Sequence, residues 1–569
     1  MSKTTVLQGL NLISAHSIVS IECNETEDVK KLLKLITGFH PIFAYKYGFS
    51  ENILQVETDI PFIWKEASEY IQKLANGKIS YEDARKYIVE TIISNRLKSM
   101  STLPILYSAL QKRYEVTPTV VKDKVIAIEE GGYTKTFNRR YTLGCGRNSQ
   151  ITASISSTKD SIASQTIQRD KYITNLMIER LGLPIVKWEL IKKKSDIEKI
   201  WGKYEKPVVI KPVGLTGGQG VTVGIKTIKE AEKAFDDALE KIRTRERKEW
   251  QTKIMIQEQV QGEDYRLLVI DGKLEIATKR IPAFVIGDGQ KNIKQLIEET
   301  NNDPRRDTTN PAHTLKPIII DKPLEECLKE QKLSLKDIPE KNEKIYVRKV
   351  ASMSQGGITE DFTDSVGSEI KYIVESIAKS THAFALGVDV LCKDLSSPLT
   401  KENGGILEIN TMPEAYLNLF PVIGEDRSYI AKTFVEKLLK DNHTKRIVVV
   451  GNPTVDIPTL LKQKTLLWSY LNQEDIVGEY RDGEIRINGL DINKGLEKAK
   501  GVEALKINAS LDAIIIHHRD WDEVEEVGFG FNEIDLLVVT KDTKKDDRFK
   551  NTLKYWLQKK IKSIRTVRG

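Results

Sequence analysis

Two short segments carry residues whose types and spacing could act on a phosphate. In the first, the apolar residues 208–210 are followed by Lys211 and then by Gly214, Gly217, Gly218 and Gly220. Such a loop can fold backbone N–H groups around a polyphosphate, because glycine tolerates positive φ and close approach. In the second, Glu408 and Asn410 stand two apart on an expected strand, so both project from one face as oxygen ligands suited to Mg²⁺. Together the segments predict a site for ATP with magnesium, although a hairpin turn remains the alternative for the glycine loop alone.

Composition narrows the class of protein that contains these segments. The chain has 569 residues, of which 40% are hydrophobic and 30% charged, as in ordinary globular proteins of roughly three to four domains. Its net charge of +7 is a small difference between 88 basic and 81 acidic residues, which argues against nucleic acid as a partner. No run of about 18 apolar residues occurs, and residues 1–23 lack a signal-peptide core. The four cysteines show no metal-binding spacing, so we expect a cytoplasmic protein with free thiols and no membrane partner.

Three blocks are expected along the chain, and their element pattern predicts an α/β fold with α+β elements. The first, residues 1–155, contains helical stretches at 63–74 and 81–97 and a strand-rich segment at 120–143. The second, residues 156–443, alternates strands with helices, including one helix over 161–181 and a polar surface excursion at 308–343. The third, residues 444–569, begins with a strand at 446–450. No internal repeat is found.

The central block resembles the ATP-grasp ligases called cyanophycin synthetases. The resemblance covers roughly residues 140–440 and rests on a series of motifs in the family's order. The series is Asp170 and Lys171, Lys211 and Pro212, Glu258, then residues 262–269, 280–283, 287–289, 302–305, 354–357, 387–389 and 408–410. Glutathione-forming bifunctional enzymes share several of these motifs, so the family is better defined than the substrate.

The resemblance implies roles for the nucleotide-binding residues. Lys171 and Lys211 would contact the ATP phosphates, a task that suits compact cations. Glu258 and Val260 would lie at the hinge that contacts adenine. The ribose hydroxyls would meet Asp264, or alternatively its neighbour Glu263.

It also implies the chemistry, in which ATP phosphorylates a carboxylate and an amine then displaces phosphate to form an amide. Asp389, Glu408 and Asn410 resemble the residues that hold Mg²⁺ against the phosphates. Arg280 and Arg266 are the candidates for stabilising the charge that builds on phosphoryl and acyl oxygens, with a structural ion pair as the alternative. The loop containing Ser354, Gly356 and Gly357 could offer N–H groups to a substrate carboxylate, or could be a plain turn.

The third block resembles the start of the Mur-ligase-like part of two-headed cyanophycin synthetases, but its P-loop is missing. After Gly451 there is neither the second glycine nor the lysine before Ser or Thr, and Pro453 and Pro458 have no N–H to donate. A single working ATP site resembles the shorter second class, which joins β-aspartyl-arginine dipeptides into a polymer. A ligase adding one amino acid or another dipeptide, and a non-catalytic partner of a full-length synthetase, are the alternatives. Two departures bear on substrate choice, namely residues 411–420 and the loop residues Gly217 and Gln219. The family also suggests a homodimer or higher homo-oligomer.

Overall fold

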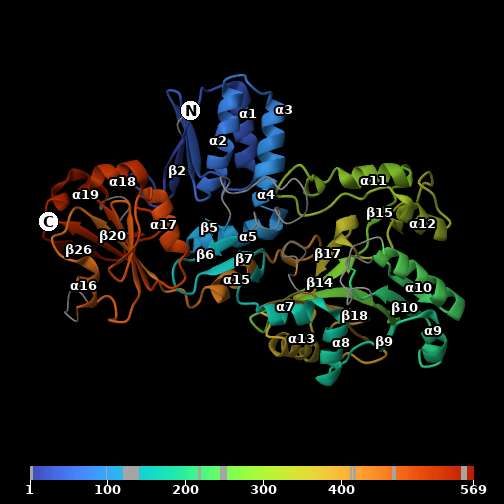
Figure 1. Cartoon of the computed structure of the whole chain (residues 1–569). Helices are drawn as coiled ribbons and strands as arrows, with labels where there is room; N and C mark the ends of the chain where they lie inside the picture. Colours follow the sequence, from blue (N-terminus) through green and yellow to red (C-terminus); the bar gives the residue numbers. More distant parts are fainter. Residues whose placement is uncertain are drawn as a thin grey trace. The chain divides into compact units, whose positions relative to one another are not determined.

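The computed structural model describes residues 4–97, 99–119, 140–215, 219–243, 253–410, 413, 418–463, 469–552 and 560–569. It has the mixed α/β architecture that the sequence predicts, and its contacts divide it into two compact units (Figure 1). Unit 1 comprises Met1–Ala153, Thr309–Ala312 and Lys432–Gly569, and unit 2 comprises Ser154–Thr308 and His313–Ala431. Among the described residues, no helix is both long and apolar enough to cross a membrane.

The first part of unit 1 is an antiparallel sheet with helices along one side (Figure 1). Its strands run in the order β1 (Thr4–Leu7), β2 (Ser17–Glu22), β4 (Ile53–Thr58) and β3 (Lys46–Ser50). The helices are α1 (Glu27–Phe39), α2 (Pro61–Ala75), α3 (Tyr81–Arg85), a π-helical turn (Lys86–Ile93), α4 (Ser94–Arg96) and α5 (Ser99–Gln111). The helical stretches expected at 63–74 and 81–97 are therefore confirmed. A small antiparallel set follows with β5 (Val116–Pro118), β6 (Tyr141–Leu143) and β7 (Gln150–Ala153), whereas most of the strand-rich segment expected at 120–143 lies outside the described residues.

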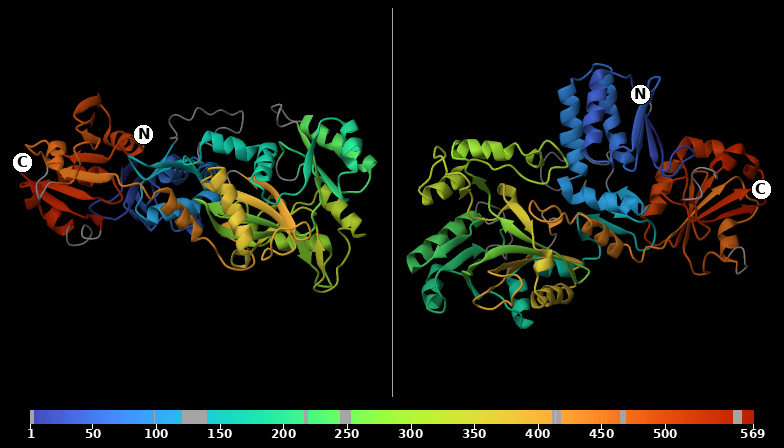
Figure 2. Two further views of the ribbon diagram at one scale, coloured as in Figure 1. Left: turned by 90° about the horizontal axis from the view of Figure 1, so that it is seen from below. Right: turned by 180° about the vertical axis from the view of Figure 1, so that it is seen from behind.

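The last part of unit 1 is a seven-stranded sheet buried on both faces. Its order is β23 (Leu490–Asn493), β22 (Glu484–Ile487), β21 (Val477–Arg481), β24 (Ala513–His518), β20 (Lys445–Val450), β25 (Leu536–Thr540) and β26 (Ile564–Val567). The five neighbouring strands β21, β24, β20, β25 and β26 are parallel. Strands β22 and β23 are antiparallel additions at one edge. Helices α17 (Lys498–Ile507), α18 (Trp521–Val527) and α19 (Asp547–Thr552) supply residues to the core on one face, and α16 (Ile457–Lys462) does so on the other (Figures 1 and 2). Near-continuous apolar strands such as residues 447–450 are what two covered faces require.

The two parts of unit 1 are joined by hydrogen bonds between segments far apart in the sequence. Leu10 N–H donates to the Phe531 carbonyl at 2.7 Å, and Phe529 N–H donates to the Leu10 carbonyl at 2.8 Å. A side chain at Gly9 would place its Cβ 2.4 Å from the Phe531 oxygen, so this close approach requires glycine. The buried pair of Lys506 and Glu115, 2.7 Å apart, adds a contact between α17 and the residue before β5.

Among the described residues, unit 2 contains two larger antiparallel sheets and a two-stranded antiparallel pair, β15 (Phe284–Ile286) with β16 (Lys344–Tyr346). The first runs β11 (Thr222–Ile225), β10 (Val208–Pro212), β12 (Ile254–Glu258) and β9 (Trp188–Ile191), and it packs one face against α9 (Lys194–Trp201) and α10 (Ile228–Arg243). The second runs β17 (Ile358–Asp361), β14 (Lys273–Ile281), β13 (Glu263–Ile270), β18 (Ala385–Cys392) and β19 (Gly404–Asn410), and it packs one face against α13 (Ser368–Ser380). Helix α15 (Ile430–Leu438) crosses the boundary between the two units in sequence.

Two expectations for the middle of the chain need correction. The helix expected over 161–181 is two helices, α7 (Ile162–Arg169) and α8 (Lys171–Arg180), because Asp170 leaves the helical conformation and its carboxylate accepts from the N–H groups of Tyr172 and Ile173. The surface excursion expected at 308–343 contains α12 (Lys322–Glu330), which buries Leu324 and Leu328. That helix shares a small core with α11 (Ile293–Asn301), β15 (Phe284–Ile286) and β16 (Lys344–Tyr346).

Candidate active site

One face of the five-stranded sheet in unit 2 collects most of the predicted chemistry. Along β13 the apolar residues Tyr265, Leu267 and Val269 face the core under α13, so the alternate residues must point to the opposite face. Cross-strand register then places polar residues of neighbouring strands on that same face. They are Asp264 and Arg266 on β13, Thr278 and Arg280 on β14, Asp389 on β18, and Glu408 and Asn410 on β19.

A β-bulge sets the two acidic residues side by side. Val390 is opposite Ile406, but Asp389 is opposite Glu408, so Leu407 is an extra residue on β19. In a ladder without this bulge, Leu407 would be opposite Asp389, and Glu408 would be opposite the buried Val388. The bulge therefore turns Glu408 to the polar face, with Asn410 two residues further along it, opposite Gly387.

Two lysines approach Glu408 from outside this sheet. Lys171 begins α8, and its Nζ lies 2.9 Å from Glu408 Oε2 and 3.1 Å from the Leu215 carbonyl that it donates to. Lys211 on β10 is 9% exposed, and burial, only partly offset by Glu408, lowers its pKa to about 8. Burial alone would raise the pKa of Glu408, but Lys171 and then Lys211 outweigh it and bring that pKa to about 2. The site is built to keep an anionic oxygen next to two ammonium groups.

Both predicted arginines pair with Asp389. Arg266 donates through Nε to Asp389 Oδ1 and through Nη2 to Oδ2 at 3.2 Å. Arg280 donates from Nη2 to Asp389 Oδ2 at 2.9 Å and to Asp264 Oδ1 at 2.6 Å. Burial raises the pKa of Asp264 against the opposing effect of Arg280. The arginines form the ion pairs that the sequence left as their alternative role, and they lie on the same face as Asp389 and Glu408.

The hinge residues line a separate cavity of about 430 Å³ in unit 2. Glu258 and Val260, the predicted adenine contacts, border it together with the apolar Ile185, Val186 and Leu399. Neither candidate for the ribose does so, because Asp264 pairs with Arg280 and Glu263 lies 3.1 Å from Lys279. The ribose role of Asp264 or Glu263 stays a prediction.

Residues 399–404 are a part of this cavity that sequence reasoning missed. Leu399, Thr400, Lys401 and Glu402 line it from the connection between β18 and β19, and Gly404 lines it from the first position of β19. Their only sequence signal is that a polar turn directly precedes the strand of Glu408.

The glycine loop is described only in part. Gly214 follows β10, and Gly220 has φ +70°, where a Cβ would lie 2.9 Å from Pro212 Cγ. Gly217 and Gly218 lie outside the described residues, as do residues 411, 412 and 414–417. At Gly220 the need for glycine is thus confirmed by both backbone conformation and space.

The loop at Ser354 is internally hydrogen-bonded. Gly356 N–H donates to the Met353 carbonyl at 3.4 Å, and Gly357 N–H donates to the Ser352 carbonyl at 3.1 Å. Ser354 Oγ is 2.9 Å from Ser352 Oγ, and Gly356 has φ +91°. Since the glycine N–H groups are already used, this segment has the geometry of the plain turn that the sequence left open.

The polar face offers a partial fit to Mg²⁺. Glu408 keeps 23% of its side chain exposed, and the Asn410 amide Nδ2 donates to Glu408 Oε1 at 3.4 Å, which leaves the amide oxygen as a hard donor beside the carboxylate. Asp389, whose side chain is 4% exposed, has both oxygens occupied by arginines. The Glu408 oxygens are engaged by Lys171 and by Asn410 Nδ2, so Glu408 fits the ion if Lys171 shifts, and Asp389 fits it if an arginine shifts.

The turn after β20 in unit 1, whose sequence lacks the glycine and lysine of a P-loop, is filled by the chain itself. Gly451 has φ +104°, and a Cβ there would lie 2.3 Å from Thr540 Oγ1 and 3.0 Å from Thr543 Cγ2. Thr543 Oγ1 donates to the Val450 carbonyl at 3.1 Å, and Thr454 N–H donates to the Arg568 carbonyl at 3.4 Å. Side chains and backbone thus occupy the surroundings of Gly451.

Comparison with known proteins finds similarity over the part of unit 2 that carries the predicted site residues. Residues 169–283 match the family model described as "Phosphoribosylglycinamide synthetase, ATP-grasp (A) domain". The chain is 31% identical over 400 residues to cyanophycin synthetase of Synechocystis sp., which covers 70% of this chain and 44% of that protein. It is 33% identical over 312 residues to the cyanophycin synthetase of Geminocystis herdmanii, covering 54% and 34%.

Glutathione-forming proteins are also similar. The bifunctional protein GshAB of Clostridium perfringens is 26% identical over 431 residues, covering 74% of this chain and 50% of that protein. A crystal structure of the bifunctional glutathione synthetase from Pasteurella multocida aligns with a TM-score of 0.46 and 22% identity, covering 65% and 47%. The chain spans no more than half the length of these proteins. Unit 2 therefore contains a segment that matches an ATP-grasp domain, residues 169–283, and the chain is similar to cyanophycin synthetase at 31% identity and to GshAB at 26%.

Proposed function

We propose that the chain is an ATP-dependent carboxylate–amine ligase. The observation that carries this proposal is the meeting of Lys171, Lys211 and Glu408 with the arginine-bearing face of the five-stranded sheet. Two ammonium groups, two guanidinium groups and acidic oxygens in one place suit transfer of a phosphoryl group to a carboxylate. No nucleophilic side chain is needed for that reaction.

The proposed reaction has two steps. A substrate carboxylate oxygen attacks the γ-phosphorus of ATP, the bond to the β-phosphate oxygen breaks, and ADP leaves with that electron pair. An amine then attacks the acyl phosphate carbon, phosphate leaves, and the amine proton is lost as the amide forms. Lys171 and Lys211 would hold the phosphate oxygens, and Arg280 and Arg266 would stabilise the negative charge of the transferred group and the acyl oxygen.

Magnesium would be held by Glu408 and Asn410, with Asp389 as the third predicted ligand, and would neutralise charge on the triphosphate. The Glu408 pKa of about 2 keeps this carboxylate ionised across the neutral pH range. The cavity beside Glu258 and Val260 has apolar walls suited to the adenine ring.

For the substrate, we propose β-aspartyl-arginine dipeptides joined to a peptide polymer or primer. Similarity to two cyanophycin synthetases supports this choice, and the filled turn at Gly451 supports a chain with one nucleotide site. A preassembled dipeptide allows one site to extend the polymer with a single kind of bond. Similarity to GshAB over 74% of the chain favours a second candidate, a ligase that adds one amino acid or another dipeptide.

Phosphate release from ATP tests the three possibilities in one assay. The dipeptide with a short polymer primer should support turnover, whereas aspartate, arginine or glutamate with the same primer should not. Turnover with a single amino acid would instead favour the second candidate. ATP binding without turnover on any pair would refute the ligase proposal and favour a non-catalytic partner.

We also propose that the chain forms a homodimer or higher homo-oligomer. Light scattering should then give a mass at least twice the 64.6 kDa of one chain. A mass of one chain at assay concentration would rule the proposal out.

A further inference from the structure

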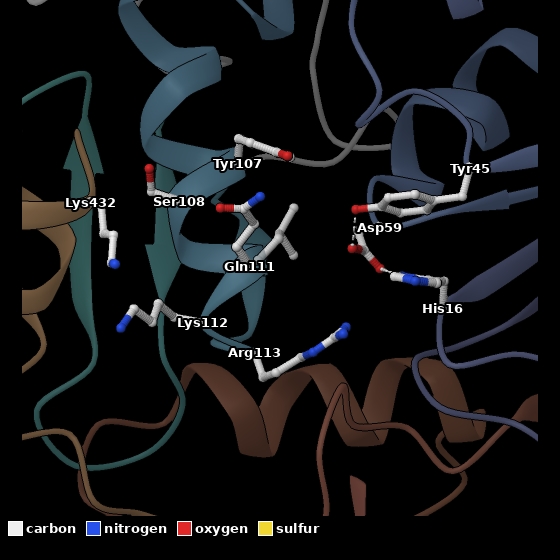
Figure 3. Close-up of a pocket in the computed structure, with 10 residues that line it drawn as sticks. His16, Tyr45, Asp59, Tyr107, Ser108, Gln111, Lys112, Arg113 and Lys432 are labelled. Carbon is white, nitrogen blue, oxygen red and sulfur yellow. Dashed lines mark hydrogen bonds and ion pairs between the residues drawn. The ribbon is translucent and has the colours of Figure 1, made fainter. Parts of the chain in front are cut away.

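Unit 1 contains a cavity that the proposed ligase reaction does not use. It has a volume of about 590 Å³ and lies between the antiparallel sheet, the end of α5 and the side chain of Lys432 (Figure 3). Its lining is mostly polar and aromatic. The residues that matter here are His16, Tyr45 and Asp59 at one side, and Arg113 and Lys432.

The acidic residue of the cavity is already satisfied. Asp59 Oδ1 lies 2.8 Å from His16 Nδ1, and Asp59 Oδ2 accepts from the Tyr45 hydroxyl at 2.9 Å. The His16 and Tyr45 rings stack with centroids 4.0 Å apart, while Tyr45 remains 42% exposed. Burial and then Asp59 raise the pKa of Tyr45, so its phenol stays a neutral donor. This side of the cavity thus presents an aromatic surface rather than an available carboxylate.

Arg113 is held in a conformation that arginine rarely adopts. Its φ is +63°, and it is the residue after the C-cap of α5. Its N–H donates to the Leu110 carbonyl at 2.9 Å, and the Tyr114 N–H donates to the Ala109 carbonyl at 3.0 Å. This is the Schellman arrangement, in which glycine is the usual residue. A left-handed L-residue costs about 1–2 kcal/mol, so an arginine here calls for a role of its side chain.

Among the residues that the structure describes, that side chain has no ion-pair partner. Figure 3 shows Arg113 reaching from the end of α5 toward the side of His16 and Asp59. Across the described ranges, its guanidinium makes neither an ion pair nor a hydrogen bond, and Lys560 is a repulsive neighbour. Lys432 is likewise without an ion pair within the part of the chain that the structure describes, whereas Lys112 pairs with Glu436 at 2.5 Å.

We propose that this cavity is a second ligand site, which binds a small organic anion through Arg113 and Lys432. A carboxylate or phosphate group on the ligand would pair with these cations, and its body would lie against the Tyr45 and His16 rings. Charge-assisted hydrogen bonds to arginine suit either group, and the cavity has the size of an ordinary small-molecule site.

Helix electrostatics alone gives a competing reason for the two basic residues at the end of α5. Cations near a helix C-terminus are stabilised by the helix dipole. Lys332 provides a matched case, because it also has φ +61° after α12, with Lys332 N–H donating to the Lys329 carbonyl and Leu333 N–H to the Leu328 carbonyl, both at 2.9 Å. It does not line this cavity. If the dipole were the whole reason, the two positions should behave alike.

Calorimetric titration of the full chain tests the proposal. Inorganic phosphate and succinate are the probes, with Mg²⁺ and a non-hydrolysable ATP analogue present to fill the nucleotide site. We expect at least one probe to bind wild type, and to bind Arg113→Gly and Lys432→Gln about tenfold or more weakly. Lys332→Gly should bind as wild type does, and Arg113→Gly should melt no lower than wild type because glycine removes the backbone strain.

The two probes separate the sources of the anion, since binding of phosphate alone indicates a phosphate ester and binding of succinate alone indicates a carboxylate. Absence of binding of either probe to wild type up to about 10 mM would overturn the proposal. So would equal binding by wild type and Arg113→Gly, or binding abolished to the same degree by Lys332→Gly.

Discussion

The ends of β10 and β20 start from the same local plan, a buried strand followed by a glycine-bearing turn. After β10, Lys211 lies beside Lys171 and Glu408, and the charged groups of several strands face one another. After β20, the closest groups to Gly451 are the side chains of Thr540 and Thr543, which hydrogen-bond locally. The difference is that other elements bring cations to the turn after β10, whereas threonine side chains fill the surroundings of Gly451.

The largest expected effect comes from removing the carboxylate at the first site. Glu408→Gln loses the partner of Lys171 and a predicted magnesium ligand, so ATP-dependent phosphate release should fall at least about 10²-fold. Glu369→Gln, an exposed carboxylate at the start of α13, is the control and should retain full activity. Normal turnover by Glu408→Gln would show that ATP use does not need this carboxylate, and would contradict the proposed difference between the turns after β10 and β20.

Arg280 distinguishes a catalytic contact from a structural ion pair. Arg280→Lys keeps a charge near Asp389 but loses the two-sided contact, and we expect kcat to fall about 10²-fold with little change in KM for ATP. Asp264→Asn leaves the guanidinium in place and should cost less than about tenfold. Equal losses in the two variants would show that only the ion pair matters.

At the second turn, stability and activity should separate. Gly451→Ala forces a Cβ to within 2.3 Å of Thr540 Oγ1 at positive φ. The free energy of unfolding should therefore fall by about 1–3 kcal/mol, and thermal unfolding should show a lower melting temperature. Phosphate release per folded molecule should stay the same. Thr454→Ala, which adds no atom, should change neither quantity, and loss of ATP use in that stable variant would mean that a nucleotide acts at this turn.

The smallest effect is expected at the turn that contains Ser354. Its neighbouring glycine N–H groups are used inside the turn, so Ser354→Ala should alter KM for the carboxylate substrate by less than about twofold. Initial rates at varied substrate concentration provide the measurement. A tenfold rise in KM with unchanged kcat would return this segment to the substrate-binding set.

Much of the site could be predicted because strand alternation and motif spacing act locally. The two-residue spacing of Glu408 and Asn410 requires a shared face, and the alternating pattern of β13 requires Arg266 to point away from Tyr265 and Leu267. Lys171 pairs with Glu408, and Glu408 and Lys171 both affect the pKa of Lys211, so the structure groups the three residues. Their roles toward nucleotide stay predictions.

The remainder depends on pairing between distant segments. Nothing local in the sequence marks Leu407 as the extra residue of a bulge, although it decides which face Glu408 occupies. The choice between ribose and Arg280 for Asp264 depends on the register of β13 against β14. The helix break at Asp170 carried a local signal, since an aspartate there can cap the helix that follows.

Because of the bulge at Leu407, the number of residues between the β18–β19 connection and Glu408 decides which face of the sheet Glu408 occupies. Asn403 donates to the carbonyls of Asp394, Ser397 and Pro398, which ties that connection at a definite length before the ladder begins. Gaining or losing one residue between Asn403 and Glu408 would move the side chains of β19 that face the core to the polar face and the polar ones to the core. A change of two residues would leave each side chain on its present face. Natural variation and engineered insertions in this short stretch should therefore be tolerated in pairs, with the count of residues mattering more than their identity.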